Sequence, residues 1–246
     1  RPEAVRRTVA EVTTVLAHRE QYFAQAGLES IRQYRAERSA GRHPDQSLGD
    51  VFLVIDGLAT LRADFEELEE RVHAIAATGI AYGVHVVITA TRWAEIRPML
   101  KDLIGTRLEL RLGDALDSEM GRKAAATVPA DRPGRGLTAE QRHLLVALPR
   151  TDGIADPETS PAGTAVVVEA CARRYRGREV PPVRLLDAQV TAEQLDTLVS
   201  ALPEPPAAHR IPIGVRESDL SVLEMDFTAE PHLLIFGDSA SGKTQT

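Results

Sequence analysis

The sequence predicts an α/β fold with a mostly parallel sheet flanked by helices. Two apolar runs support that prediction, Val51 to Ile55 and Val84 to Thr89, and the first has no polar interruption. Continuous apolar strands are typical of a parallel sheet that is covered on both faces. Between the two runs, Phe65, Leu68 and Val72 recur at helical spacing. We therefore expect a helix to cross from one parallel strand to the next.

The segments before and after these strands also carry the signals of regular elements. Apolar residues at helical spacing predict a first helix from Pro2 to Gly27 and a second from Ser30 to Ala40. Alternating residues predict a half-exposed strand from Thr106 to Leu112. Further expected elements are a strand near 143–148, an amphipathic helix over 165–175 and a helix that begins with a capping box at Thr191 and Gln194.

Composition disfavours several classes of protein. The net charge of -7 over 246 residues argues against a dedicated nucleic-acid-binding surface. The single cysteine, Cys171, excludes an internal disulfide framework and fits a reducing cytosol. No apolar run approaches the roughly 20 residues of a membrane span. We therefore expect any membrane anchor to lie in sequence outside this chain.

Asp56, which directly follows the first apolar run, is the first candidate for chemistry. In open α/β sheets, ligands bind at the carboxyl ends of the strands. A hydrophobic strand that ends in Asp is also the Walker B pattern, in which the carboxylate holds the Mg²⁺ of a bound nucleotide. An ordinary polar turn would have the same sequence, so both interpretations stay open on this stretch alone.

The end of the chain carries the second candidate, a G-x-x-x-x-G-K-[ST] P-loop. A short apolar strand is expected immediately before it, at Leu233 to Phe236. In such a loop, backbone N–H groups cradle the phosphates of ATP, the lysine reaches the β and γ phosphates and the hydroxyl binds Mg²⁺. The predicted nucleotide-binding residues are Gly237, Asp238, Ser239, Ala240, Ser241, Gly242, Lys243 and Thr244, and Thr244 is the expected Mg²⁺ ligand.

The order of the two motifs predicts that the chain crosses two tandem modules. In a P-loop NTPase the Walker A loop precedes Walker B, whereas here Walker B comes first. We expect residues 1–202 to be the rear of one module, residues 203–210 to be a Pro-rich linker and residues 211–246 to begin the next module. Asp56 and Thr244 would then bind Mg²⁺ in separate sites, and the helix that normally follows a P-loop is missing.

Polar residues beyond the second apolar run are candidates for sensing the nucleotide. In P-loop motors the strand beside Walker B carries a residue that senses the γ-phosphate, so Thr91 and then Arg92 join Asp56 as candidate catalytic residues. Both are equally explained as turn residues. Arg132 and Arg135 could reach a phosphate across a subunit boundary as arginine fingers, although a solvated loop explains them as well.

These residues resemble the FtsK/SpoIIIE family of hexameric translocase ATPases. The resemblance rests on Arg19 to Gly27 with Ile31 and Tyr34, on the Walker B strand and on Gly83 to Thr91. Within that family, further stretches are similar to the EccC ATPases of actinobacterial type VII (ESX) secretion: Asp50 to Gly57, Gly83 to Arg97, Arg107 to Asp114, Pro133 to Leu137 and Ile211 to Gly214.

The resemblance implies RecA-like P-loop NTPase modules that bind ATP and Mg²⁺, here the rear of the second ATPase module and the start of the third. It implies a hexamer, partner subunits in the inner-membrane secretion complex and WXG-type secreted substrates, whose export the ATPase powers or gates. It places the protein on the cytoplasmic face of the cell membrane. The fragment alone is expected to be inactive as an ATPase.

Two departures from the family pattern predict slow or absent hydrolysis. Active members carry Glu directly after the Walker B Asp, where it orients the attacking water, and this chain has Gly57. The family's Asp-Ser-Arg stretch appears here as Asp117-Ser118-Glu119, which removes a positive charge. We therefore expect a module that binds ATP tightly and hydrolyses it slowly or not at all.

Two other functions stay open at this point. The first is a DNA translocase of the same family, which would call for basic pore-facing loops and a winged-helix tail that this sequence does not show. The second is a structural interaction module with vestigial nucleotide sites. Gly57 favours this second alternative, and the intact P-loop opposes it.

Overall fold

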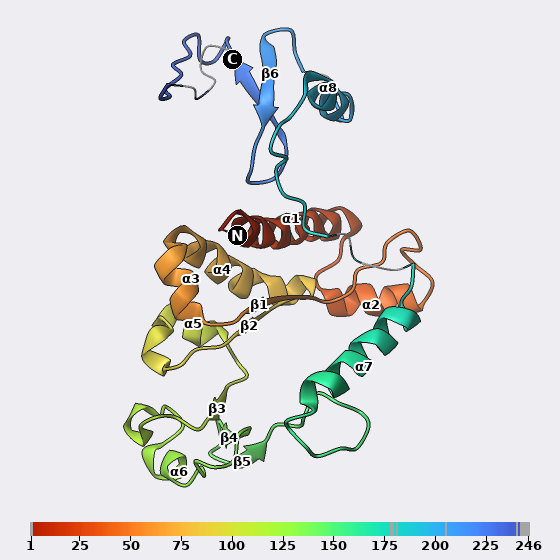
Figure 1. Cartoon of the computed structure of the whole chain (residues 1–246). Coiled ribbons are helices and arrows are strands. Elements are labelled where there is room, and N and C mark those ends of the chain that lie inside the picture. Colours follow the sequence, from red (N-terminus) through yellow and green to blue (C-terminus); the bar gives the residue numbers. More distant parts are fainter. Residues whose placement is uncertain (1, 178–179, 181, 205, 240, 242–246) are drawn as a thin grey trace. The chain divides into compact units, whose positions relative to one another are not determined.

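The structure, a computed structural model, describes residues 2–177, 180, 182–204, 206–239 and 241. The chain divides into two compact units, which are described separately. We name them the sheet unit, Ala26–Pro182, and the hairpin unit, which combines Arg1–Gln25 with Val183–Thr246. Figure 1 labels their helices and strands.

A two-stranded parallel sheet positions the candidate site in the sheet unit. Strand β1 (Val51–Ile55) pairs with β2 (Val84–Ile88), and the register runs from Val51 opposite Val84 to Ile55 opposite Ile88. Between the strands the chain forms α3 (Leu58–Asp64), α4 (Glu66–Thr78) and a 3-10 turn, η1 (Gly79–Tyr82). This helical crossover between parallel strands confirms the predicted α/β fold.

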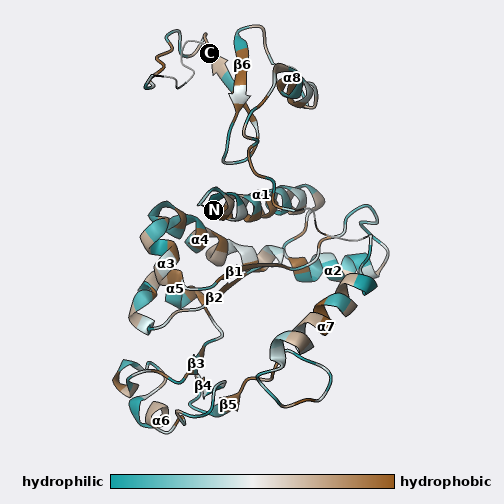
Figure 2. Ribbon diagram, viewed as in Figure 1, coloured by the Kyte–Doolittle hydropathy of each residue, from teal (hydrophilic) through white to brown (hydrophobic). Residues whose placement is uncertain are grey.

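Described residues cover only one face of this sheet. On the covered face Leu53 and Ile55 are buried, and α4 packs against β2. On the opposite face Phe52, Val54 and Val87 are 60%, 63% and 45% exposed, although both strands are hydrophobic in Figure 2. Among the described residues the crossover helix packs on one side of the sheet only, so the other face is exposed.

A second, antiparallel sheet follows, which we call the small sheet. It consists of β3 (Leu108–Leu110), β4 (Arg135–Thr138) and β5 (His143–Leu145), in that order. Met120, Ala125, Val128 and Leu137 form a buried cluster beside it, and Trp93 packs against that cluster. The short elements around it are η2 (Trp93–Glu95), α5 (Pro98–Leu103), η3 (Ala115–Asp117) and α6 (Arg122–Ala126).

Strand β3 faces the opposite way from the one that a hydrophobic alternation would give. Leu108 and Leu110 are 56% and 47% exposed, whereas Glu109 between them is only 3% exposed. The predicted strand at Thr106 to Leu112 is thus confirmed over its centre, but the carboxylate and not the leucines faces the buried cluster. The partner residues explain this orientation, because Trp93 and Ser118 both donate hydrogen bonds to Glu109.

Two further helices complete the sheet unit. Helix α2 (Ile31–Ser39) begins at an N-cap, Ser30, whose side chain accepts a hydrogen bond from the Gln33 backbone. Helix α7 (Ser160–Arg174) has Gly163 as its one buried residue among those described, and Val166 and Val168 are 58% and 62% exposed. The predicted amphipathic helix exists there, but its apolar residues lie in solvent.

The hairpin unit joins the first helix of the chain to its last third. It contains α1 (Pro2–Ala26), α8 (Ala192–Ser200), β6 (Arg210–Val215) and β7 (Val222–Asp226), and the two strands pair antiparallel. Helix α8 begins with the predicted Thr191–Gln194 capping box. No helix in the part of the chain that the structure describes is long and apolar enough to cross a membrane.

A buried arginine ties three segments of the hairpin unit together. Arg7 on α1 is 1% exposed and donates hydrogen bonds to the carbonyl oxygens of Arg184 and Ser218, at 2.9 and 2.6 Å. Its guanidinium also pairs with Glu11 at 2.9 Å. Since a buried guanidinium needs acceptors for its donors, these contacts explain why α1 associates with residues far along the chain.

The strand predicted just before the P-loop is wrong. Leu233 to Phe236 adopt no regular secondary structure, and Leu234 and Phe236 are 75% and 87% exposed. A strand needs a partner for its backbone groups, and the two strands of the hairpin unit pair with each other. Apolar sequence alone therefore does not make this segment a strand.

Candidate nucleotide site

Asp56 and Thr89 form the candidate site at what we call the carboxyl edge, where β1 and β2 end. The Thr89 hydroxyl donates a hydrogen bond of 2.6 Å to Asp56 Oδ1 and accepts one of 2.8 Å from the Gly57 backbone N–H. The Thr89 backbone is fixed too, because its N–H donates to Ile55 and its carbonyl accepts from Leu58. One threonine therefore holds the aspartate and the turn that follows it.

The Asp56 carboxylate is free to bind a ligand. Both Asp56 and Thr89 are exposed, and among the described residues no hydrogen bond or ion pair reaches Asp56 Oδ2. Mg²⁺ in nucleotide sites takes one or two carboxylates and otherwise binds phosphates and water. Within the described residues no group of three or more metal-ligating side chains exists. The donor set therefore suits a nucleotide-bound Mg²⁺ and not a cation held by protein ligands alone.

The opposite edge of the same sheet has a different chemistry. Asp50, just before β1, accepts hydrogen bonds from His85 at 2.8 Å and pairs with Arg35 at 2.6 Å. These two partners lower the pKa of the Asp50 carboxyl below its ordinary value. Asp50 Oδ1 is thus engaged by a histidine and an arginine, whereas Asp56 Oδ1 is engaged by the uncharged hydroxyl of Thr89.

Gly57 occupies a backbone conformation that suits glycine. Its φ of 86° and ψ of 76° are left-handed, and it is the N-cap of α3. A Cβ at this position would find space, since the nearest atom is Thr60 Oγ1 at 3.7 Å. The obstacle to another residue is therefore backbone strain and not crowding. A glutamate at position 57, as the family pattern has it, would have to adopt this left-handed conformation, which is unfavourable for a residue with a Cβ.

The two predicted sensor residues lie in a turn that Glu95 closes. The Thr91 backbone N–H donates to Glu95 Oε2 at 3.0 Å, and Arg92 Nε lies 3.6 Å from Glu95 Oε1. Arg62 on α3 donates to the Glu95 carbonyl. Neither Thr91 nor Arg92 has a described contact with Asp56. The threonine that touches Asp56 is Thr89, the residue directly after β2, which no linear motif distinguishes.

The strand register could have identified Thr89. Ile55 lies opposite Ile88, so the next residue on each strand, Asp56 and Thr89, must come side by side. Thr91 lies two residues further along the chain, and its sensor role stays a prediction. The direct contact follows from register alone, once the two strands are known to be parallel.

The remaining predicted residues lie elsewhere. In the hairpin unit Gly237, Asp238, Ser239 and Ser241 are described and lie outside helices and strands, whereas Ala240, Gly242, Lys243 and Thr244 lie outside the described residues. Arg132 and Arg135 flank a turn into β4, where the Arg135 N–H donates to the Arg132 carbonyl. Glu119, which replaces the family's arginine, forms an ion pair with Lys101.

Comparison with known proteins defines the class. The chain matches the FtsK/SpoIIIE family over residues 1–153. Because this match covers more than half of its length, the chain belongs to the FtsK/SpoIIIE family.

Its relatives are secretion proteins. The chain is 45% identical over 242 residues to the ESX secretion system protein EccC of Thermomonospora curvata, which is 98% of this chain and 18% of that protein. It is 41% identical over 253 residues to the ESX-1 secretion system protein EccCb1 of Mycolicibacterium smegmatis, which is 99% of this chain and 41% of that protein. The chain therefore spans less than half the length of either relative.

Solved structures confirm the fold. The structure of Thermomonospora curvata EccC, described as ATPases 2 and 3 in complex with a signal sequence peptide, matches with a TM-score of 0.87 at 45% identity, and the match covers 98% of this chain and 42% of that one. EssC (ATPases 2 and 3) from Geobacillus thermodenitrificans matches with a TM-score of 0.64 at 21% identity, over 98% of this chain and 45% of that one, a likeness of fold alone. The resemblance to EccC and the P-loop ATPase fold that the sequence predicts are both confirmed.

Proposed function

We propose that this chain is part of a type VII secretion ATPase and that Asp56 binds the Mg²⁺ of ATP in one of its nucleotide sites. The observation that supports the site most directly is the contact between Asp56 and Thr89 at the carboxyl edge, which leaves one carboxylate oxygen open. The identity of 45% to an EccC protein supports the secretion role. The position of Asp56 also agrees with the general location of ligands in α/β sheets.

The site at Asp56 is completed by sequence that precedes this chain in the whole protein. The relatives are more than twice as long as the chain, and the open face of the β1–β2 sheet presents Phe52, Val54 and Val87 to solvent. An apolar sheet face of this kind needs cover. Residues 1–202 are then the rear of one module, residues 203–210 are the linker and residues 211–246 open the next module.

The P-loop at 237–244 serves a second, separate nucleotide site. Its sequence supplies the phosphate cradle, with Lys243 for the β and γ phosphates and Thr244 as the Mg²⁺ ligand. Asp56 and Thr244 therefore belong to different ATP molecules. Thr91 and Arg92 remain proposed γ-phosphate sensors for the site at Asp56.

Hydrolysis at Asp56 is slow or absent. A glutamate after the Walker B aspartate would orient the attacking water, and the left-handed Gly57 replaces it. ATP bound here acts mainly to hold an interface. We propose that the whole protein forms a hexamer, works with the inner-membrane secretion complex at the cytoplasmic face of the cell membrane and exports WXG-type substrates.

The test is Mg·ATP binding by the full-length protein, in a Lys243→Ala background that silences the second site. Asp56→Asn keeps the shape of the side chain but removes the charge, and we expect Mg-dependent affinity to fall at least about tenfold. Asp50→Asn, at the other edge of the same sheet, is the matched control and should bind as the parent does. Equal affinities for Asp56→Asn and its parent would overturn the proposed site.

A further inference from the structure

Glu109 is a buried carboxylate with both oxygens in use. Its side chain lies in the middle of β3 and is 3% exposed. Trp93 Nε1 donates a hydrogen bond of 2.6 Å to Oε2, and the Ser118 hydroxyl donates one of 2.7 Å to Oε1. The three residues come from three separate segments: the turn after β2, strand β3 and the loop before α6.

The Ser118 hydroxyl takes part in three hydrogen bonds. Besides donating to Glu109, Ser118 Oγ accepts hydrogen bonds from the backbone N–H groups of Met120 and Gly121, both at 3.1 Å. Met120 belongs to the buried cluster against which Trp93 packs. The carboxylate therefore bridges Trp93 to the hydrogen-bonded loop before α6.

This arrangement is unfavourable in itself, which argues that it has a role. Among the described residues no ion pair reaches Glu109, so its charge is stabilised by two neutral donors. Burying a carboxylate without a cation is destabilising, and the same orientation leaves Leu108 and Leu110 exposed. Turning the strand so that the leucines face inward and position 109 faces solvent would bury more apolar surface. In that orientation residue 109 could not accept the hydrogen bond that Trp93 donates.

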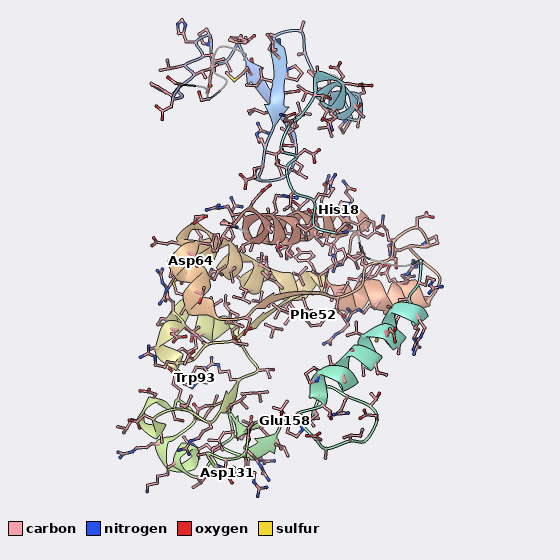
Figure 3. The ribbon with its side chains drawn as sticks, viewed as in Figure 1. His18, Phe52, Asp64, Trp93, Asp131 and Glu158 are labelled. Carbon is pink, nitrogen blue, oxygen red and sulfur yellow. The ribbon has the colours of Figure 1, made fainter. Side chains whose placement is uncertain are left out.

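Trp93 lies in the middle of the Thr91–Glu95 turn, directly after the proposed sensors Thr91 and Arg92. The indole, labelled in Figure 3, lies beside Lys101 of α5, whose ammonium is 5.8 Å from the ring centroid. Trp93 begins η2, and Glu95 at the end of η2 accepts the Thr91 N–H. The indole therefore holds the middle of the turn, and the Thr91–Glu95 hydrogen bond joins its two ends.

We propose that Glu109 is a positioning residue which, through Trp93, holds the Thr91–Glu95 turn in place beside Mg·ATP bound at Asp56. This inference rests on the proposed function of the Asp56 site. Glu109 touches no nucleotide. It couples the carboxyl edge of the parallel sheet to the small sheet, so that nucleotide occupancy at the edge and order in the small sheet depend on each other.

The test compares Glu109→Gln with wild type in the full-length protein, by amide hydrogen exchange of residues 91–95 and by Mg·ATP affinity in the Lys243→Ala background. Glutamine has the same size, but its amide NH₂ cannot accept a hydrogen bond, so one of the two donors, Trp93 or Ser118, loses its acceptor. We expect exchange at 91–95 to rise at least about tenfold and affinity to fall several-fold, because a lost hydrogen bond to a buried charge shifts local opening by that order. Glu140→Gln is the matched control, since Glu140 is an exposed acid that accepts from Thr138 at the end of β4.

A merely structural role gives a different result. If Glu109→Gln raises exchange equally across β3, β4 and β5, or leaves both the turn and the affinity unchanged, the positioning role is overturned. If Glu109→Gln does not fold, Ser118→Ala replaces it as the test variant. This substitution removes one hydrogen-bond donor to Glu109 but keeps the carboxylate charge. If Asp56→Asn binds Mg·ATP normally while Glu109→Gln still loosens residues 91–95, the proposed nucleotide site fails and the coupling of the turn to Glu109 stands.

Discussion

At the scale of single residues, the carboxyl edge is built from a threonine and a glycine around one aspartate. Thr89 uses its hydroxyl twice, as donor to Asp56 and as acceptor from Gly57. Gly57 supplies the left-handed turn into α3. The geometry that presents Asp56 to solvent thus depends on two small neighbours, and each can be tested by a change of a few atoms.

Thr89→Val should weaken Mg·ATP binding at Asp56. The substitution keeps the shape but removes the hydroxyl, so the carboxylate loses a donor and the Gly57 N–H loses an acceptor. We expect affinity in the Lys243→Ala full-length protein to fall about tenfold. Thr89→Ser keeps the hydroxyl and should stay within about twofold of the parent. A loss in Thr89→Ser without a loss in Thr89→Val would show that the methyl group, and not the hydrogen bond, matters.

Gly57→Ala should destabilise the sheet unit through its backbone. An alanine in the left-handed region costs about 1–2 kcal/mol, and Gly57→Glu carries the same strain. Gly105→Ala is the control, because a Cβ there meets nothing within 4 Å and no left-handed φ applies. Urea denaturation measures both. A Gly57→Ala protein as stable as the Gly105→Ala protein would contradict the strain. Because Gly57→Glu carries this strain, we expect it to raise ATP hydrolysis less than the added carboxylate alone would.

At the scale of elements, local sequence signals predict the position of a helix or strand better than they predict which of its residues are buried. The strands at 51–55 and 84–88, their crossover helix and the Thr191 capping box follow from periodicity and cap chemistry, which are local. Local signals do not predict that Glu109 faces inward or that residues 233–236 form no strand. Both features depend on partners, namely Trp93 and Ser118 in one case and a pairing strand in the other, and partners far along the chain are invisible to a local pattern.

The candidate site also contains residues that a linear pattern predicts and residues that only the contacts between segments reveal. Asp56 was predictable because Walker B is a short linear pattern, and Gly57 because it departs from that pattern. Thr89 needed the register between two strands, and the role of Glu109 needed the path of three segments. The sequence contains the residues of the site, but the contacts that orient them arise only when separate segments meet.

The loop that leads into α7 should show a pH dependence set by one ion pair. Arg150 Nε and Nη2 each lie 2.7 Å from an Asp152 oxygen, and this pairing lowers the pKa of the Asp152 carboxyl to about 2. A lowered folded-state pKa means that the stabilisation is complete above the usual value of 3.8 and is lost as the pH falls toward about 2.

Side-chain NMR titration measures this directly. Arg150→Lys replaces the planar fork by a single ammonium, so we expect the Asp152 pKa to move up toward its usual value. Asp152→Asn should remove the acid-dependent part of the hydrogen-exchange protection of residues 150–163 while leaving protection of β1 unchanged. A titration of Asp152 at its usual pKa in the wild type would contradict the bidentate pair.

At the scale of the whole molecule, we propose that the chain carries parts of two nucleotide sites, one in each unit. Asp56 lies in the sheet unit and the P-loop sequence in the hairpin unit. The relatives are longer than the chain, and the apolar face of the β1–β2 sheet has no cover among the described residues. We therefore propose that the two motifs belong to neighbouring modules of a tandem ATPase and not to one shared site.

The stoichiometry of bound nucleotide tests that assignment most directly. Isothermal titration of the full-length protein with a non-hydrolysable ATP analogue and Mg²⁺ would compare wild type, Asp56→Asn, Lys243→Ala and the double variant. We predict that each single variant loses one equivalent of nucleotide per chain and that the double variant loses two. If one substitution alone removes both equivalents, or if the double variant loses no more than a single one, the two motifs do not serve separate sites.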